Sequence, residues 1–535
     1  MKLLSFLIRA LNLGILFAIS LAVCGCGRHQ AASEESPVLH RGLSGEPSTL
    51  DPASSGDNFS AQVLQDLYEG LTAETSEGTV VPAVASSWTI EPGGLRYTFH
   101  LRSTARWSNG YPVRAQDFVA AWRRVVDPKQ GSPVADDLRA IHGVPEILAG
   151  RASPLTLGVS APSDDTLVVN LDLPTPHLPE VLSHSVAFPI YSESAARTHD
   201  PAAWVSNGAY ILTRWQTGSS IELTQNPKYW DRPNVHIPRV KFQFASDENT
   251  QYAQYRAGEL DMTDVVPASA IPSLGEAKAK ELIIAPFLAT AYYGLNLASQ
   301  PLGSQVKLRQ ALSMAIDRHR LVDSFGFGQP PAYGFIPAGL WNYEQQSYAW
   351  KILPDAERLQ QARQLYTAAG FSNKTPLHLR VLFNSNAVIK RTAIMIAAMW
   401  KEELGIDCEL IEEEYRSFLV SRHDRARWDV ARLAWVADFN DANNFLEILR
   451  SRSNNNDERY SNLAFDKLID EASVAADASI RRSILESAER LMLEDYPIIP
   501  LYHFVSKRLV KPYVHGVRPS PTDRVPSKAI SISAQ

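Results

Sequence analysis

The sequence predicts an α/β fold with mixed sheets, and three observations support this class. Segments typical of buried strands alternate with segments typical of amphipathic helices, which argues against a helical bundle or an all-β sandwich. The 535 residues are too many for one ordinary hydrophobic core, so two or three globular lobes are expected. A charged fraction of 21% together with 9% aromatic residues argues against extended disorder.

Local patterns place several elements of this fold. The predicted strands are 97–101, 166–171 and 377–382, and the predicted helices are 355–369, 388–404 and 480–494. Gly370 is placed to end the first of these helices. Phe118, Trp122 and Val126 recur every four residues, which predicts the buried face of a further helix.

The N-terminal segment differs from the rest of the chain. A short apolar stretch at 11–23 is too short to span a bilayer comfortably, and the small residue Gly25 directly precedes Cys26. This arrangement resembles a bacterial lipobox. We therefore predict a lipoprotein signal peptide at 1–25, lipidation of Cys26 and a lipid-anchored polar tether at 26–37. An ordinary secretory signal cut near Cys26 is the alternative.

Charge and cysteine content limit the partners and the compartment. The formal net charge is −6 and no long Lys/Arg block is present, so nucleic acid is not an expected partner. If Cys26 carries lipid, Cys408 has no intramolecular partner, and an exported domain would depend on its hydrophobic core alone. We expect a membrane-anchored protein in the periplasm or at the cell surface.

Several short blocks resemble the peptide- and nickel-binding family of solute receptors for ABC importers. The longest of them lies between Val81 and Phe118 and consists mostly of turn and core residues. The matching blocks are 46–52, 66–71, 81–88, 97–102, 107–113, 115–118, 207–210, 226–231, 257–261, 309–312, 315–318, 331–334 and 508–512. They extend over roughly residues 38 to 535, and within the family they look closest to the oligopeptide-binding branch.

The resemblance implies a three-lobed fold of the periplasmic-binding-protein type, with two main lobes around a ligand cleft and one inserted lobe. Hinge closure between the two main lobes would enclose the ligand. The implied boundaries are 38–68, 189–288 and 505–535 for lobe I, 69–188 for lobe II, and 289–504 for lobe III.

The segment 429–440 is where we expect the binding site. A receptor for many peptide sequences must bind what all peptides share, namely the α-ammonium, the α-carboxylate and the backbone. This segment is mostly apolar but contains Arg432 and Asp438, which fits a buried strand and loop with charges facing a cleft. From the residues alone, Asp438 could instead cap a helix and Arg432 could pair with it internally.

The resemblance assigns roles to residues in and around this segment. Asp438 would bind the peptide amine, Arg432 would bind the carboxylate of a three-residue peptide, and Trp435 would form a cleft wall. The remaining implied site residues are Asn58 in a loop that bonds the ligand backbone, Phe287 and Tyr415 as aromatic walls, and Arg422 as a second arginine near the carboxylate. Each aromatic residue could equally be simple packing, and the spacing after Arg422 carries one extra residue relative to the family.

The chain also departs from the family pattern. Ala289 and Val436 stand where well-studied members of the branch have a disulfide. Ile389 replaces a histidine that can meet the carboxylate of a longer peptide, and Gly56 replaces an acidic residue in the first ligand loop. Our hypothesis is that these changes narrow the length preference to very short peptides.

These observations predict a substrate-binding lipoprotein that captures short oligopeptides and delivers them to the permease of an ABC importer. We expect a monomer with no cofactor and no metal site. The chain has no Gly-x-Ser-x-Gly, His-Glu-x-x-His or phosphate-binding glycine loop, so an enzyme is not expected. The alternatives are a receptor for nickel, another metal chelate or haem, a receptor for peptidoglycan-derived peptides, and a surface adhesin or sensor on the same fold.

Overall fold

The computed structural model describes residues 37–191, 204–245, 247–275, 279–326, 328–340, 342–372, 374–475 and 477–533, without the side chain of Arg416. The predicted signal peptide, Cys26 and the tether up to residue 36 lie outside the described residues.

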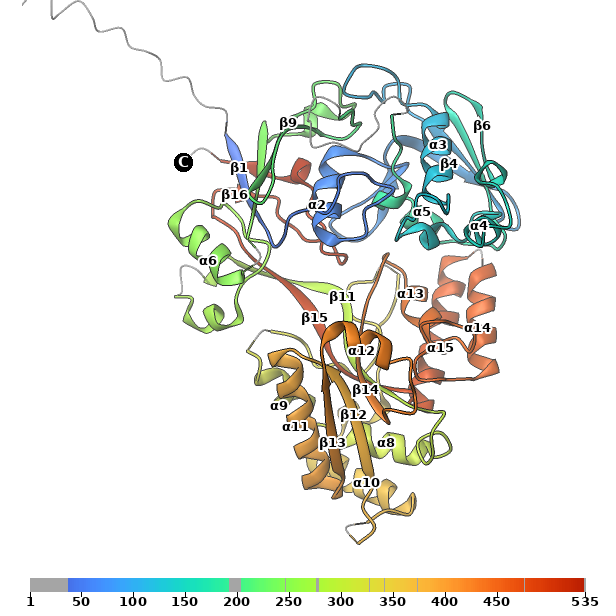
Figure 1. The fold of residues 1–535 in the computed structure, drawn as a ribbon, viewed down its shortest axis with the longest axis vertical. Helices are drawn as coiled ribbons and strands as arrows, with labels where there is room; N and C mark the ends of the chain where they lie inside the picture. Colours follow the sequence, from blue (N-terminus) through green and yellow to red (C-terminus); the bar gives the residue numbers. More distant parts are fainter. Residues whose placement is uncertain are drawn as a thin grey trace, which may run out of the picture. The chain divides into compact units, whose positions relative to one another are not determined.

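The largest sheet has five strands in the order β13-β12-β14-β11-β15. These strands are β11 (Leu282–Leu295), β12 (His378–Asn384), β13 (Asp407–Glu413), β14 (Val430–Val436) and β15 (Ile498–Leu509). Strand β12 is parallel to β13 and β14, whereas β11 is antiparallel to β14 and β15. This mixture confirms the predicted fold class. Figure 1 shows the long strands β11 and β15 running from this sheet towards α6 (Glu248–Ala257).

Two four-stranded sheets precede it in the chain. The first has the order β1-β10-β9-β8 and contains β1 (Val38–Leu43), β8 (Tyr210–Gln216), β9 (Ser220–Gln225) and β10 (Arg239–Phe244). The second has the order β4-β5-β7-β6 and contains β4 (Ala85–Ile90), β5 (Arg96–Leu101), β6 (Val159–Ser163) and β7 (Thr166–Asn170). Two short pairs are β2 (Thr72–Glu74) with β3 (Val80–Pro82), and β16 (Val514–His515) with β17 (Ser531–Ile532).

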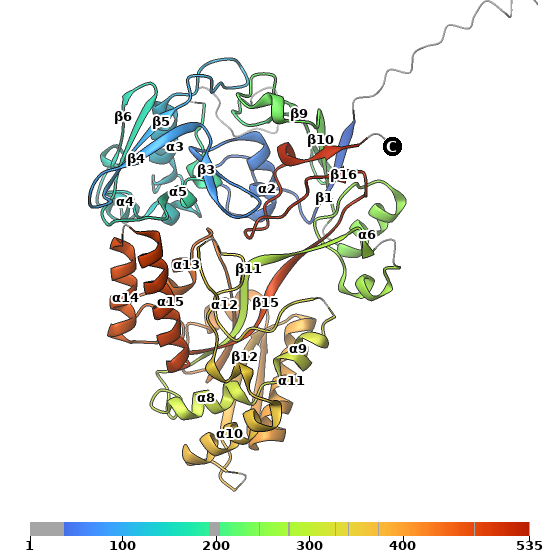
Figure 2. The same cartoon turned by 180° about the vertical axis from the view of Figure 1, so that it is seen from behind.

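Helices cover these sheets, and Figure 2 shows α8, α10 and α11 beside β12. Trp400 of α11 donates its indole N–H to the Leu312 carbonyl of α8 at 2.9 Å. Besides α6, the α-helices are α2 (Asn58–Leu67), α3 (Ala115–Val125), α4 (Val144–Leu148), α5 (Leu178–Val181), α8 (Val306–Met314), α9 (Arg318–Asp323), α10 (Asp355–Ala368), α11 (Ala387–Leu404), α12 (Tyr415–Ser421), α13 (Asn443–Leu446), α14 (Leu463–Val474) and α15 (Ala478–Asp495).

The local predictions agree with these elements. Strands β5, β7 and β12 confirm the three predicted strands, and α10, α11 and α15 confirm the three predicted helices with ends shifted by at most two residues. Gly370 follows α10 with φ of +91°, a conformation that favours glycine, and this accounts for the end of the helix. Phe118, Trp122 and Val126 are all fully buried, as their spacing predicts.

Two large hydrophobic cores organise the described residues. One joins the 69–188 segment to its flanking segments and to the C-terminal segment, from Leu39 to Ile530. The other contains residues between Leu288 and Tyr502 only. The proposed lobe boundaries stay a prediction, since the first core is continuous across the predicted junctions near residues 69 and 188.

Buried polar contacts fasten the C-terminal segment to the N-terminal part of the chain. Ser527 donates its backbone N–H and its hydroxyl to Asp66 at 2.8 and 2.6 Å, and Arg41 donates to the Ser527 hydroxyl at 2.6 Å. Lys528 forms an ion pair with Glu69 at 2.9 Å. Removing one partner from such a buried network leaves an uncompensated polar group, so these contacts fix the path of the chain end.

In the described part of the chain, every helix is too short or too polar to cross a lipid bilayer.

Candidate ligand-binding site

Strand β14 and the loop after it carry the charged residues that stand out in the sequence. The strand is central in the mixed sheet, where Val430, Ala431 and Leu433 are buried against its neighbours. A central strand covered on both faces accounts for the mostly apolar sequence at this point. The strand ends at Val436, and Asp438 follows it as an exposed loop residue.

Asp438 is held by an amide rather than by a basic side chain. The Asn444 amide nitrogen donates to Asp438 Oδ2 at 3.3 Å, and the Asn444 amide oxygen accepts from the Asp438 backbone N–H at 3.3 Å and from Trp435 Nε1 at 2.8 Å. Although the residue is solvent-accessible, desolvation by its surroundings raises the pKa of the Asp438 carboxyl above its usual value. No basic side chain of the described residues forms an ion pair with it, so its charge is available to a cation.

The two alternative roles considered for this segment are not seen. Helix α13 has its first backbone N–H, that of Asn443, bonded by Asp441 at 2.8 Å, and not by Asp438. Asp441 in turn forms two hydrogen bonds with Arg481, at 2.6 and 2.9 Å. Within the described chain, no contact pairs Arg432 with Asp438.

A second acidic residue, Asp137, interacts electrostatically with Asp438. Asp137 lies in the short 3₁₀-helix η1 (Ala135–Leu138), and desolvation followed by the charge of Asp438 raises the pKa of Asp137 to about 7. Two like charges that raise the pKa of a carboxyl in this way would be relieved by an ammonium group bound near both of them. The sequence did not single out Asp137, because its electrostatic contact with Asp438 joins segments that are distant in the chain.

The 54–58 loop lies beside the segment that carries η1. Gln130 donates its side-chain amide to the Ser54 hydroxyl at 2.9 Å. A Cβ atom added at Gly56 would lie 2.7 Å from Pro133 Cγ, so any side chain at Gly56 would require Pro133 to move. The departure from the family at Gly56 therefore accompanies close packing between these two segments.

Arg432 supplies a positive charge on β14. Its register partner on β11 is Tyr293, and the side chain is half-buried. Burial raises the pKa values of Tyr292 and Tyr293, and the charge of Arg432 offsets this only in part. Across the described residues, the guanidinium has no ion-pair or hydrogen-bond partner, which leaves its donors available to a carboxylate.

The remaining predicted residues lie at four separate places. Trp435 is half-buried and bonded to Asn444, as described above, and Phe287 is half-buried in β11. Tyr415 begins α12 and is exposed, whereas Asn58 is the exposed first residue of α2. Within the described chain, no hydrogen bond or ion pair joins Asn58, Phe287 or Tyr415 to the charged residues of the site, and their roles stay predictions.

Arg422 follows α12 and lies 3.5 Å through Nε from Asp457 Oδ2. Its charge acts on the Tyr292 hydroxyl together with that of Arg432, so the two arginines share a neighbour. Ile389, by contrast, is buried in a small apolar cluster with Phe383 and Ala393, and its side chain has no polar atom to offer a carboxylate.

The structure places the two residues of the missing disulfide directly opposite each other. Ala289 of β11 is the register partner of Val436 of β14. The Ala437 N–H donates to the Leu288 carbonyl at 2.8 Å, so Leu288 and Ala437 form a hydrogen-bonded pair. The adjacent pair, Ala289 and Val436, is therefore of the non-hydrogen-bonded type, whose closer spacing suits a disulfide.

We predict that the double substitution Ala289→Cys with Val436→Cys forms a disulfide in air. The bridge should raise the free energy of unfolding by about 2–4 kcal/mol. Thiol titration and thermal unfolding with and without reductant measure both effects, and each single variant is the control. Cys408 is a free thiol in every variant, so the wild type gives the baseline, and two titratable thiols above that baseline after oxidation would contradict the inferred register.

Among the described residues, neither a metal site nor the large cavity includes Asp438 or Arg432. Within the described residues, His, Cys, Asp and Glu side chains form no group of three placed to hold a metal. A cavity of about 740 Å³ is lined by Trp88, His177, Asp441 and Arg481, among others, but not by Asp438 or Arg432.

Comparison with known proteins identifies the class of receptor. A periplasmic oligopeptide-binding protein of Salmonella typhimurium is 36% identical over 498 residues, covering 91% of this chain and 90% of that protein. A probable deoxycholate-binding periplasmic protein of Escherichia coli is 35% identical over 496 residues, covering 91% and 92%. The unliganded open form of a periplasmic murein tripeptide-binding protein has a TM-score of 0.86 at 33% identity, covering 93% of this chain and 98% of that chain.

A family model decides the assignment, because the model of the bacterial extracellular solute-binding proteins, family 5, matches residues 79–457. The chain belongs to this family. Family 5 contains substrate-binding proteins of ABC importers, so this family 5 receptor is a binding protein and not an enzyme. The relatives also confirm the predicted α/β fold of the periplasmic-binding-protein type.

Proposed function

We propose that this family 5 receptor captures short peptides between Asp438 and Arg432 and delivers them to the membrane permease of an ABC importer. The observation that carries the proposal is the pair of opposite charges on one strand and its following loop, each without an ionic partner in the described chain. Desolvated charges are costly unless a partner arrives, and a zwitterionic peptide supplies both partners.

The chemistry at each end follows from the side chains present. The peptide ammonium would donate to Asp438, and its positive charge would favour the ionised form of Asp137, which interacts electrostatically with Asp438. The peptide carboxylate would accept two parallel hydrogen bonds from the planar guanidinium of Arg432. Trp435, held by Asn444, would provide an apolar wall for a peptide side chain.

Peptidoglycan-derived peptides are a second candidate ligand class. One observation favours them, namely the TM-score of 0.86 with a structure described as a murein tripeptide-binding protein. Such peptides carry the same ammonium and carboxylate groups, so the same residues would bind them. A metal chelate or haem has no comparable observation in its favour.

We also propose that the receptor is a lipoprotein anchored to the membrane through Cys26. The support comes from the sequence alone, where the apolar stretch 11–23 is followed by Cys24, the small residue Gly25 and then Cys26. Mass spectrometry of the protein from the membrane fraction tests the anchor, with Cys26→Ser as the unmodified control.

Calorimetric titration with blocked peptides tests peptide capture. We expect trialanine to bind, and N-acetyl-trialanine and trialanine amide each to lose at least tenfold in affinity, on the order of 1.4 kcal/mol or more, because each lacks one of the two charges. The same titration with di- to pentaalanine tests the preference for very short peptides. Equal affinity for the free and both blocked tripeptides would contradict the proposed function, and equal affinity across the length series would contradict the length preference alone.

A further inference from the structure

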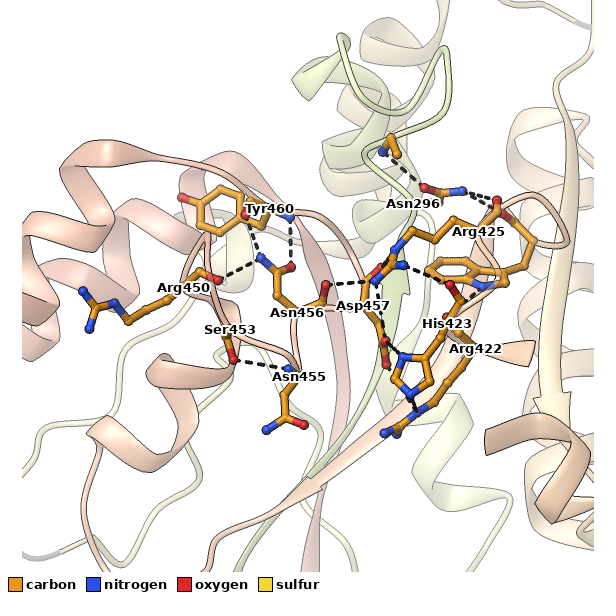
Figure 3. Close-up of polar contacts among 12 residues, drawn as sticks. Asn296, Arg422, His423, Arg425, Arg450, Ser453, Asn455, Asn456, Asp457 and Tyr460 are labelled. Atoms are coloured by element: carbon orange, nitrogen blue, oxygen red, sulfur yellow. Dashed lines mark hydrogen bonds and ion pairs between the residues drawn. The ribbon is translucent and has the colours of Figure 1, made fainter. Parts of the chain in front are cut away.

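Asp457 lies at the centre of a charged network at the arginine-rich side of the site (Figure 3). Its carboxylate is 3% exposed and contacts three basic side chains. His423 Nδ1 lies 2.8 Å from Oδ1, Arg422 Nε lies 3.5 Å from Oδ2, and an Arg425 Nη atom lies 3.9 Å from Oδ1. A carboxylate buried in this way is fixed by its partners rather than by water.

The loop that carries Asp457 is held in place by its neighbours. The Asn456 side chain donates to the carbonyls of Arg450 and Tyr460 at 3.0 and 2.7 Å and accepts from the Tyr460 N–H at 3.0 Å. Arg425 Nε donates to the Asp457 carbonyl at 3.0 Å. These bonds fix the position of the Asp457 carboxylate, so that it can orient the longer side chain of Arg422.

Arg422 is oriented through one side of its guanidinium only. Nε lies near Asp457 and within 3.5 Å of His423 Nε2, as Figure 3 shows. In the described part of the chain, its two Nη groups have no hydrogen-bond partner, and 29% of the side chain is exposed. The planar Nη pair is the part of the guanidinium that binds a carboxylate in two parallel hydrogen bonds.

Glu458 lies next to Asp457 but adds little negative charge to the network at neutral pH. Its side chain is completely buried and, among the described residues, neither carboxylate oxygen has a hydrogen-bond partner, so burial raises the pKa of Glu458 to about 8. At neutral pH Glu458 is therefore mostly uncharged. Burial also raises the pKa of Asp457, but the charges of Arg422, His423 and Arg425 act against this, so Asp457 is the carboxylate that pairs with Arg422.

We propose that Asp457 is a positioning residue that holds Arg422 with its Nη pair turned towards the carboxylate of a bound peptide. This inference rests on the proposed function and deepens it, since it makes the contact of Arg422, the second arginine already expected near the carboxylate, depend on Asp457. Asp457 would act only through Arg422, at whichever peptide length Arg422 meets the carboxylate.

The test measures how much a free carboxylate increases the affinity of each peptide for the receptor. Di-, tri- and tetraalanine and their C-terminal amides are titrated into the wild type and into Arg422→Lys, which keeps the charge but lacks the planar Nη pair. We expect at least one length for which Arg422→Lys lowers the ratio of carboxylate to amide affinity about tenfold. Asp457→Asn should lower the same ratio at the same length by a similar factor, and the double variant should lower it no further.

A matched control removes the same charge from the same region of the chain. Asp470 lies on the exposed side of α14 and pairs with Arg450, so Asp470→Asn should leave every ratio unchanged. If Asp457→Asn does not fold, Asp457→Glu keeps the charge but shifts the carboxylate, and it should lower the same ratio.

Three results would overturn the inference. They are a folded Asp457→Asn or Asp457→Glu protein with the ratios of the wild type, losses that add in the double variant, and an Arg422→Lys protein that matches the wild type at every length. A wild-type protein that binds none of the free peptides would instead contradict the proposed function.

Discussion

Replacing Asp438 with Asn is expected to weaken peptide binding at least a hundredfold, or about 3 kcal/mol. The reason is that the peptide ammonium leaves water when it binds, and in the variant it meets an amide instead of a carboxylate. Asn keeps the shape of the side chain, and the Asp438 backbone N–H retains its bond to Asn444. Calorimetric titration with trialanine at neutral pH measures the loss.

Two comparisons separate the role of Asp438 from general effects of charge. Asp470→Asn removes an equal charge from the exposed side of α14 and should bind like the wild type. N-acetyl-trialanine has no ammonium, so its affinity should be almost the same for the wild type and for Asp438→Asn. If trialanine binds both proteins equally, Asp438 does not hold the amine, and the site must be sought elsewhere.

Elements with a strong local pattern could be predicted from the sequence. Helix α10 keeps an apolar face and ends before Gly370, and the start of β12 alternates apolar residues with His378 and Arg380, so the predicted ends of both elements lie within two residues of the observed ones. The opposition of Ala289 and Val436 was expected only through the resemblance to a family, and the register of β11 and β14 now places the two residues face to face.

Contacts between distant segments could not be predicted in this way. Residues 454–459 are six polar residues in succession, a pattern typical of an exposed turn. Yet Glu458 is completely buried, because its carboxylate lies against Gly294 of β11, where an added Cβ would be 2.4 Å from Oε1. Asp137 was missed for the same reason, since its partner Asp438 comes from a different part of the chain.

The buried Glu458 should make the stability of the receptor depend on pH. Its pKa is raised to about 8 in the folded protein, whereas a carboxyl in an unfolded chain has a pKa of about 4.3. Folding therefore keeps a proton that the unfolded chain releases, so the free energy of unfolding falls as pH rises between these two values. From about pH 5 to pH 8 this group alone should lower the free energy of unfolding by about 3 kcal/mol.

Glu458→Gln removes this titration while keeping a side chain of similar shape. We expect the variant and the wild type to have similar stability near pH 5, and the variant to be more stable by about 3 kcal/mol near pH 8. Urea unfolding followed by tryptophan fluorescence at both pH values measures the difference. Glu471→Gln is the matched control, because Glu471 lies on α14 in an exposed pair with Lys467 at 3.3 Å, and it should show no such change with pH.

Glu180 and Glu489 are also buried carboxyls with raised pKa values, so the wild type alone would not isolate Glu458. The decisive quantity is the difference between the Glu458→Gln and wild-type curves, and parallel curves would mean that Glu458 ionises in the folded protein as readily as in the unfolded chain.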